Sequence, residues 1–166
     1  LTEFGIGSPR SAVMLGAGAT ARSALLALAN LGVTEVEVVA RNSAKVNTLQ
    51  SVGDSIGIQV QSRPLDESSW LTADVVINTT PRGAMDDIAH EVISPTGTLL
   101  DVVYDPWPTL FAAAWGVQGG QILSGLSMLL HQAVHQVTLM TSHVGPLEPM
   151  RSALNLELLN RGLTTI

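Results

Sequence analysis

The sequence contains no cysteine and few charged residues. Only 13% of its 166 residues are Asp, Glu, Lys or Arg, whereas a soluble domain usually carries about 25%. Without a thiol the chain has no disulfide scaffold, and the apolar fraction of 46% excludes an intrinsically disordered chain. A coiled coil, which is rich in Glu and Lys, is excluded as well. The composition predicts one compact domain whose uncharged surface faces another domain or subunit.

Long apolar runs and an excess of positive charge are also missing. No apolar run reaches the roughly 18 residues of a membrane span, and no basic segment followed by an apolar one opens the chain as a signal peptide would. The net charge of −6 gives no electrostatic reason to expect nucleic acid. We therefore expect a cytoplasmic protein with no membrane and no nucleic acid as partner. Because residue 1 is Leu rather than Met, we expect a fragment of a longer protein.

Short apolar runs alternate with helical patterns along the chain. The strands are predicted at 12–15, 35–40, 58–61, 73–78, 97–103 and 121–123, and the helices at 20–31, 43–52, 108–115, 126–142 and 149–160. Ser43 is expected to cap the second helix and Pro108 to begin the third. Apolar strands that alternate with helices form a parallel sheet with helices on both faces. The predicted fold class is therefore α/β, a Rossmann-like doubly wound parallel sheet.

A glycine-rich turn joins the first predicted strand to the first helix. Its sequence, G-A-G-A-T-A at 16–21, matches the dinucleotide-binding pattern G-x-G-x-x-G/A. Gly16 permits the tight turn, Gly18 lets a pyrophosphate approach the backbone, and Ala21 keeps helix and strand close. Free N–H groups and the dipole at the helix start favour the phosphates. A turn without a ligand is less favoured, because an Ala-rich helix needs no two glycines before it.

The residues after the second strand distinguish between cofactors. An NAD site has Asp or Glu there to hold the ribose hydroxyls, whereas this chain has Arg41, Asn42, Ser43 and Lys45. A guanidinium can bind a 2′-phosphate through two hydrogen bonds and stack on adenine. Solvated cations are the alternative, but the helix dipole disfavours cations at a helix start. We therefore predict NADP(H) rather than NAD.

Other candidate sites carry weaker signals. The segment N-T-T-P-R-G at 78–83 follows the fourth strand, where ligands of α/β sheets lie, but its proline and glycine equally suit an ordinary turn. His131 and His135 have a spacing that can bind a metal. No Cys or carboxylate cluster completes that site, so we predict two half-buried helix histidines and no metal. The three Trp residues are expected to be packing residues.

Five segments together resemble the NADP-binding half of the shikimate dehydrogenase family over nearly the whole chain. They are G-A-G-A-T-A-R at 16–22, A-R-N-S at 40–43, I-N-T-T-P-R-G at 77–83, D-V-V-Y-D-P at 101–106 and G-L-S-M-L-L-H-Q-A at 125–133. Typical motifs of the family read G-A-G-G-A, N-R-T and G-L-G-M-L-x-x-Q. Three residues fit them, namely Arg41, Met128 and Gln132. Four depart from them, namely Ala19, Ala40, Asn42 and Ser127.

This resemblance implies an activity and a set of site residues. The full protein would reduce 3-dehydroshikimate to shikimate with NADPH, reversibly, in aromatic amino-acid (chorismate) biosynthesis. Tyr104 and Gln132 would contact the substrate. The implied cofactor-binding residues are Gly16, Ala17, Gly18, Ala19, Thr20, Arg41, Asn42, Ser43, Lys45, Thr79, Thr80, Val102, Gly125 and Met128.

The resemblance also implies that catalysis depends on residues outside this chain. The family's catalytic Lys and Asp lie in an N-terminal substrate domain, and neither is present here. Residues 1–124 would form the NADP-binding domain, while the helices of 125–166 would pack back toward the substrate domain. The fragment alone is expected to bind NADPH without turnover, and a homodimer is a further expectation. Two alternatives stay open: a quinate/shikimate-type dehydrogenase, and a non-catalytic dinucleotide-binding module that senses redox state.

Overall fold

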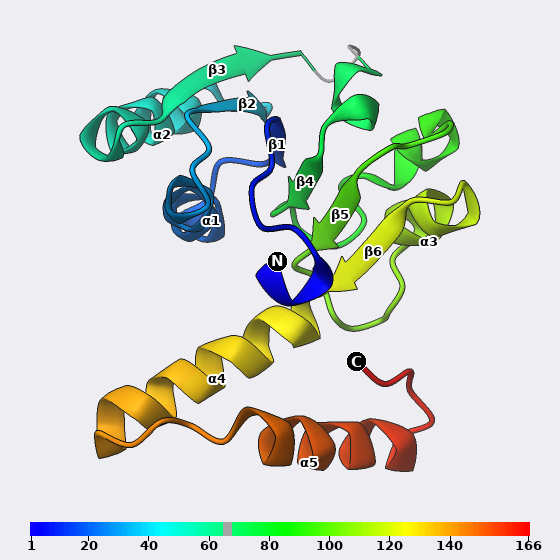
Figure 1. Cartoon of the computed structure of the whole chain (residues 1–166). Coiled ribbons are helices and arrows are strands. Elements are labelled where there is room, and N and C mark those ends of the chain that lie inside the picture. The colour runs from blue at the N-terminus through cyan, green and yellow to red at the C-terminus, as the bar shows by residue number, and fades with distance from the viewer. Residues whose placement is uncertain (65–67) are drawn as a thin grey trace.

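A six-stranded parallel sheet forms the centre of the molecule. The computed structural model describes residues 1–64 and 68–166. The order of the strands in the sheet is β3-β2-β1-β4-β5-β6, and all neighbouring pairs are parallel. This is the strand order of the doubly wound dinucleotide-binding fold, so the predicted fold class is confirmed (Figure 1). The strands are β1 (Ala12–Leu15), β2 (Glu35–Val39), β3 (Gln59–Arg63), β4 (Val75–Asn78), β5 (Thr98–Asp101) and β6 (Gln121–Ser124).

Helices cover both faces of this sheet. On one face α1 (Ala19–Asn30) and α2 (Ser43–Ile56) pack on the first strands. On the other face lie α3 (Leu110–Val117) and the 3-10 helices η2 (Ser68–Thr72) and η3 (Asp86–Glu91). After β6, α4 (Gly125–Thr141) and α5 (Leu147–Asn160) form an antiparallel hairpin that extends away from the sheet (Figure 1).

Three aromatic side chains fill the core on the α3 face. The ring of Trp70 lies 5.7 Å from that of Phe111 and 6.2 Å from that of Trp115, and all three are at most 1% exposed. Trp107 packs on the same cluster from its edge. Such rings contribute large buried apolar areas, so the expected packing role of the three Trp residues is confirmed.

Two helix starts differ from the expected ones. Asn42, not Ser43, caps α2, because its backbone is extended and its Oδ1 accepts the N–H of Lys45 at 3.2 Å. Thr109 caps α3, with its Oγ1 accepting the N–H of Ala112 at 3.0 Å, so the helix starts after Pro108 rather than at it. An Asn or Thr in extended conformation can reach an unpaired N–H of the first turn. In both cases the N-cap is a neighbour of the residue at which the helix was expected to begin.

The N-terminal 3-10 helix η1 (Thr2–Phe4) is tied to the last two helices. The carboxylate of Glu3 lies 2.7 Å from the Nε2 of His131 in α4 and also binds the guanidinium of Arg151 in α5. His131 and His135 are exposed rather than half-buried. Within residues 1–64 and 68–166 no cluster of metal-binding side chains is present, and no helix is long and apolar enough to cross a membrane.

Candidate functional site

The glycine turn lies directly against the end of β4. Gly16 has φ +99°, and its N–H donates to the carbonyl of Val39 at 2.8 Å. A Cβ at Gly16 would lie 2.7 Å from the Oγ1 of Thr79 and 3.3 Å from the Cγ2 of Thr80. Thr79 is fixed there because both its N–H and its Oγ1 donate to the carbonyl of Leu15, at 2.8 and 3.0 Å. The turn and the two threonines therefore form one wall at the carboxyl ends of β1 and β4.

The start of α1 is open to a ligand. Gly18 is the N-cap residue, and no side chain caps the helix. A Cβ at Gly18 would meet nothing within 4 Å, so this glycine is not required by packing. The first turn holds no acidic residue. Unpaired N–H groups and a positive dipole end suit a phosphate group at this position.

Two cations follow the end of β2, next to the glycine turn. Arg41 and Lys45 are exposed, and neither forms an ion pair with any residue that the structure describes. Ser43 is exposed beside them, and the first turn of α2 contains no acid. The Oδ1 of Asn42 accepts the hydrogen bond of the helix cap, so the NH2 group of the same side chain remains available to donate to a ligand. The group has the charge and donors that a second phosphate requires.

The ends of β5 and β6 meet in a close backbone contact. A Cβ at Gly125 would lie 2.0 Å from the carbonyl oxygen of Val102, so only glycine fits there. Val102 is linked to β4 in turn, because its N–H donates to the carbonyl of Asn78 at 3.0 Å. Met128 follows one turn later in α4 and is half-buried. The expected cofactor residues of these segments therefore share the carboxyl edge of the sheet with the glycine turn.

The two expected substrate-binding residues, Tyr104 and Gln132, follow the ends of β5 and β6 in the chain, and their side chains form no hydrogen bond with the described residues of this edge. Tyr104 follows β5 and is 47% exposed, and Gln132 lies one turn beyond Met128 on α4 and is exposed. No hydrogen bond of either side chain is found among the described residues. Both are accessible to a molecule outside this chain.

A buried polar cluster that was not predicted from the sequence lies beneath this edge. Asn78, Asp101 and Ser124 end three adjacent strands in register, and their exposures are 3%, 0% and 4%. Burial raises the pKa of Asp101, and the nearby Asp86 carboxylate raises it further, against hydrogen bonds from Thr109, Val103 and Asn78. The sequence contains a pattern that could have predicted this cluster, because each of these three apolar strands ends in a polar residue.

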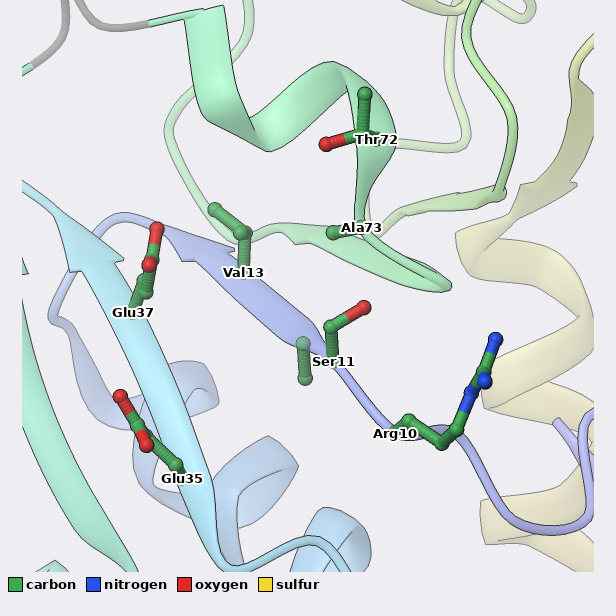
Figure 2. A pocket seen from close by; sticks show the side chains of 8 residues that line it. Arg10, Ser11, Val13, Glu35, Glu37, Thr72 and Ala73 are labelled. Carbon is green, nitrogen blue, oxygen red and sulfur yellow. The ribbon is translucent and has the colours of Figure 1, made fainter.

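A cavity lies at the opposite edge of the sheet. It has a volume of about 350 Å³ and is lined at the amino ends of β1 and β2, with Glu35, Glu37 and Arg10 among its walls (Figure 2). Both carboxylates are partnered: Glu35 accepts from Gln61 at 2.6 Å and Glu37 from Arg63 at 3.0 Å. Ligands of open α/β sheets bind beyond the carboxyl ends of the strands, so we place the functional site at the other edge.

The strand order, the glycine turn and the free helix start define a dinucleotide-binding domain of the doubly wound class. Comparison with known proteins identifies its family. The sequence model of the Shikimate 5'-dehydrogenase C-terminal domain matches residues 125–154. A relative from Rhizobium rhizogenes, named shikimate dehydrogenase (NADP(+)), is 34% identical over 74% of this chain and 44% of its own length.

Solved structures give the same result over most of the chain. The crystal structure of Mycobacterium tuberculosis shikimate dehydrogenase is 42% identical, has a TM-score of 0.81, and matches 90% of this chain and 57% of its own. Quinate dehydrogenase from Corynebacterium glutamicum, in complex with NAD, is 27% identical with a TM-score of 0.76, over 87% of this chain and 54% of its own. The chain belongs to the shikimate dehydrogenase family. It spans about half the length of the curated relatives it matches.

Proposed function

We propose that residues 1–166 are the NADP(H)-binding portion of a shikimate dehydrogenase, an oxidoreductase that reversibly reduces 3-dehydroshikimate to shikimate in aromatic amino-acid biosynthesis. The observation that carries the proposal is the pair of cations beside the glycine turn, Arg41 and Lys45, neither of which forms an ion pair with a residue that the structure describes. A 2′-phosphate supplies the anion that this pair lacks. The curated relatives are named for NADP(+).

In this proposal each wall of the site holds one part of the cofactor. Residues Gly16 to Thr20 hold the pyrophosphate, and Arg41, Asn42, Ser43 and Lys45 hold the 2′-phosphate. Thr79 and Thr80 line the cleft, while Val102, Gly125 and Met128 bracket the nicotinamide, which supplies the hydride when bound. The residues fit that group, because Gly18 leaves open space and the α1 start is uncapped.

The rest of the reaction requires groups that we assign to another domain of the same protein. Ketone reduction needs a group that protonates the developing alkoxide. In the described part of this chain the only phenol beyond a strand end is Tyr104, which we assign with Gln132 to substrate binding. We therefore propose that 1–124 bind the cofactor and that 125–166 pack against an N-terminal substrate domain. Exposed apolar side chains on the α4–α5 hairpin support this, namely Leu139, Met140, Val144, Leu156 and Leu159.

A comparison of cofactor affinities tests the proposal. Arg41→Ala should weaken NADPH binding about tenfold or more and leave NADH binding unchanged, because a charge-assisted hydrogen bond to the 2′-phosphate is lost. Arg161→Ala is the matched control, since among the described residues Arg161 forms its ion pair with Glu157 at the end of α5 and is not one of the proposed cofactor-binding residues. Equal losses for NADPH and NADH in Arg41→Ala would contradict the assignment.

The same measurements weigh two alternatives. The quinate dehydrogenase neighbour carries NAD, so tighter binding of NADH than of NADPH by the wild-type chain would favour a quinate/shikimate-type enzyme. A non-catalytic redox-sensing module would bind NADPH without any substrate domain in the same protein. We expect residues 1–166 to bind NADPH without oxidising shikimate, and measurable NADPH formation from shikimate by this chain would overturn that expectation. A cytoplasmic location and a homodimeric state complete the proposal.

A further inference from the structure

A single buried carboxylate holds both ends of the loop that follows β5. The Oδ1 of Asp101 accepts the N–H of Val103 at 3.1 Å, and its Oδ2 accepts the hydroxyl of Thr109 at 2.8 Å. The segment between these two anchors carries Tyr104, which is 47% exposed. Asp101 itself is 0% exposed. The buried side chain of Asp101 therefore holds the two ends of this loop, Val103 and Thr109, from the protein interior.

Further hydrogen bonds join this carboxylate to the neighbouring elements. Thr109 Oγ1 accepts the N–H of Ala112, which connects Asp101 to the first turn of α3. On the other side Asn78 is the partner of Asp101 in the sheet register, its carbonyl accepts the N–H of Val102 at 3.0 Å, and its side chain acts to lower the pKa of Asp101. The Oδ1 of Asn78 accepts both the N–H and the hydroxyl of Thr80, at 3.1 and 2.7 Å. The β4 loop and the β5 loop are thus held by one network.

The carboxylate of Asp101 is buried beneath the candidate site and does not line it. The space beside Asp101 is a cavity of about 10 Å³, and a single water already needs about that volume. A cofactor therefore cannot reach the carboxylate without rearrangement. The N–H of Val103 and the hydroxyl of Thr109 donate to different oxygens of Asp101. An asparagine side chain could not replace both acceptors, because it has one acceptor oxygen and an NH2 group that donates.

We propose that Asp101 is a positioning residue that holds the Val103–Thr109 loop and Thr80 in place for the nicotinamide half of the cofactor. This inference rests on the proposed function. The adenosine half lies at Arg41 and Lys45, beyond β2, and contacts no member of the network. Loss of the carboxylate should therefore weaken the two halves of the site unequally.

Two probes separate the halves: NADPH, and adenosine 2′,5′-bisphosphate, which lacks the nicotinamide. Asp101→Asn should lower the affinity for NADPH about tenfold, as for one lost hydrogen bond to a charged group, and leave that for the bisphosphate unchanged within about twofold. Asp87→Asn, at an exposed carboxylate of η3, is the control and should change neither. Equal losses for both probes, or no loss for NADPH, would overturn the inference.

A second pair of variants tests the network without altering the buried charge. Thr109→Val removes the hydroxyl that donates to Asp101, whereas Thr109→Ser keeps it. Only the valine variant should lose NADPH affinity and show faster amide hydrogen exchange at residues 103–107, and identical behaviour of the two would contradict the role of Asp101. If the wild-type chain binds the bisphosphate but not NADPH, the inference fails alone; if it binds neither, the proposed function fails with it.

Discussion

Gly16 and Thr79 approach so closely that no side chain fits between them: a Cβ on Gly16 would lie 2.7 Å from the Oγ1 of Thr79. Gly18, two residues later, has no neighbour within 4 Å of such an atom. The fold therefore requires glycine at position 16. Position 18 has space for a side chain, so its glycine is explained by a ligand that contacts the turn from outside.

This difference predicts that the same substitution at the two glycines affects different properties, namely stability at Gly16 and cofactor binding at Gly18. Gly16→Ala should lower the free energy of unfolding by about 2 kcal/mol or more, because φ +99° is strained for alanine and the methyl group collides with Thr79. Gly18→Ala should cost at most about 1 kcal/mol as an N-cap change, yet weaken NADPH binding. Urea denaturation and NADPH titration of the two variants provide the test. Wild-type NADPH affinity in Gly18→Ala would argue against a phosphate at this turn.

A second prediction concerns the hydroxyl of Ser124. It is buried and has no hydrogen-bond partner among the described residues. Burial of an unpaired hydroxyl is unfavourable, so Ser124→Ala should raise the free energy of unfolding by about 1 kcal/mol. Ser51→Ala, at an exposed position of α2 where the hydroxyl donates to the carbonyl of Asn47, serves as the control and should change the free energy of unfolding by about 0.5 kcal/mol or less. A Ser124→Ala protein less stable than the wild type would show that the hydroxyl has a partner in solution.

A third prediction follows from the raised pKa of Asp101. Burial disfavours its charged form, so the folded state binds the proton more tightly than the unfolded state, in which the pKa is near 3.8. The stability contribution of Asp101 is therefore greatest below pH 3.8 and decreases as the pH rises through the raised pKa of the folded state. The free energy of unfolding of the wild type, relative to Asp101→Asn, should increase between neutral pH and about pH 4. A difference that is constant or decreases over this range would mean that the carboxylate is not destabilised by burial.

Much of the fold follows from local sequence patterns. The run Ala12–Leu15 is apolar throughout because both sides of β1 are buried, and a glycine turn at its end marks the start of α1. Strand and helix positions could therefore be predicted to within a few residues, and with them the doubly wound parallel sheet.

The contacts within the site could not be predicted in the same way. Asn42 and Ser43 are both good helix caps, and only the backbone geometry decides between them. Asp101 and Thr109 meet because the chain turns back between them, and no periodic pattern reports such a turn. The pairing of Glu3 with His131 and Arg151 joins the first residues to the last helices, so it depends on the complete fold.

The position of β1 in the sheet has a consequence for how the chain acquires its structure during synthesis. β1 pairs with β2 on one side and with β4 on the other, and parallel neighbours can be joined only through long crossovers. When β1, α1 and β2 have left the ribosome, one edge of β1 still lacks its partner. The apolar residues of this strand, at most 3% exposed in the finished fold, stay partly uncovered until β4 is made. Folding of this chain therefore depends on late, long-range pairing, which is slow and leaves an open strand edge in the meantime.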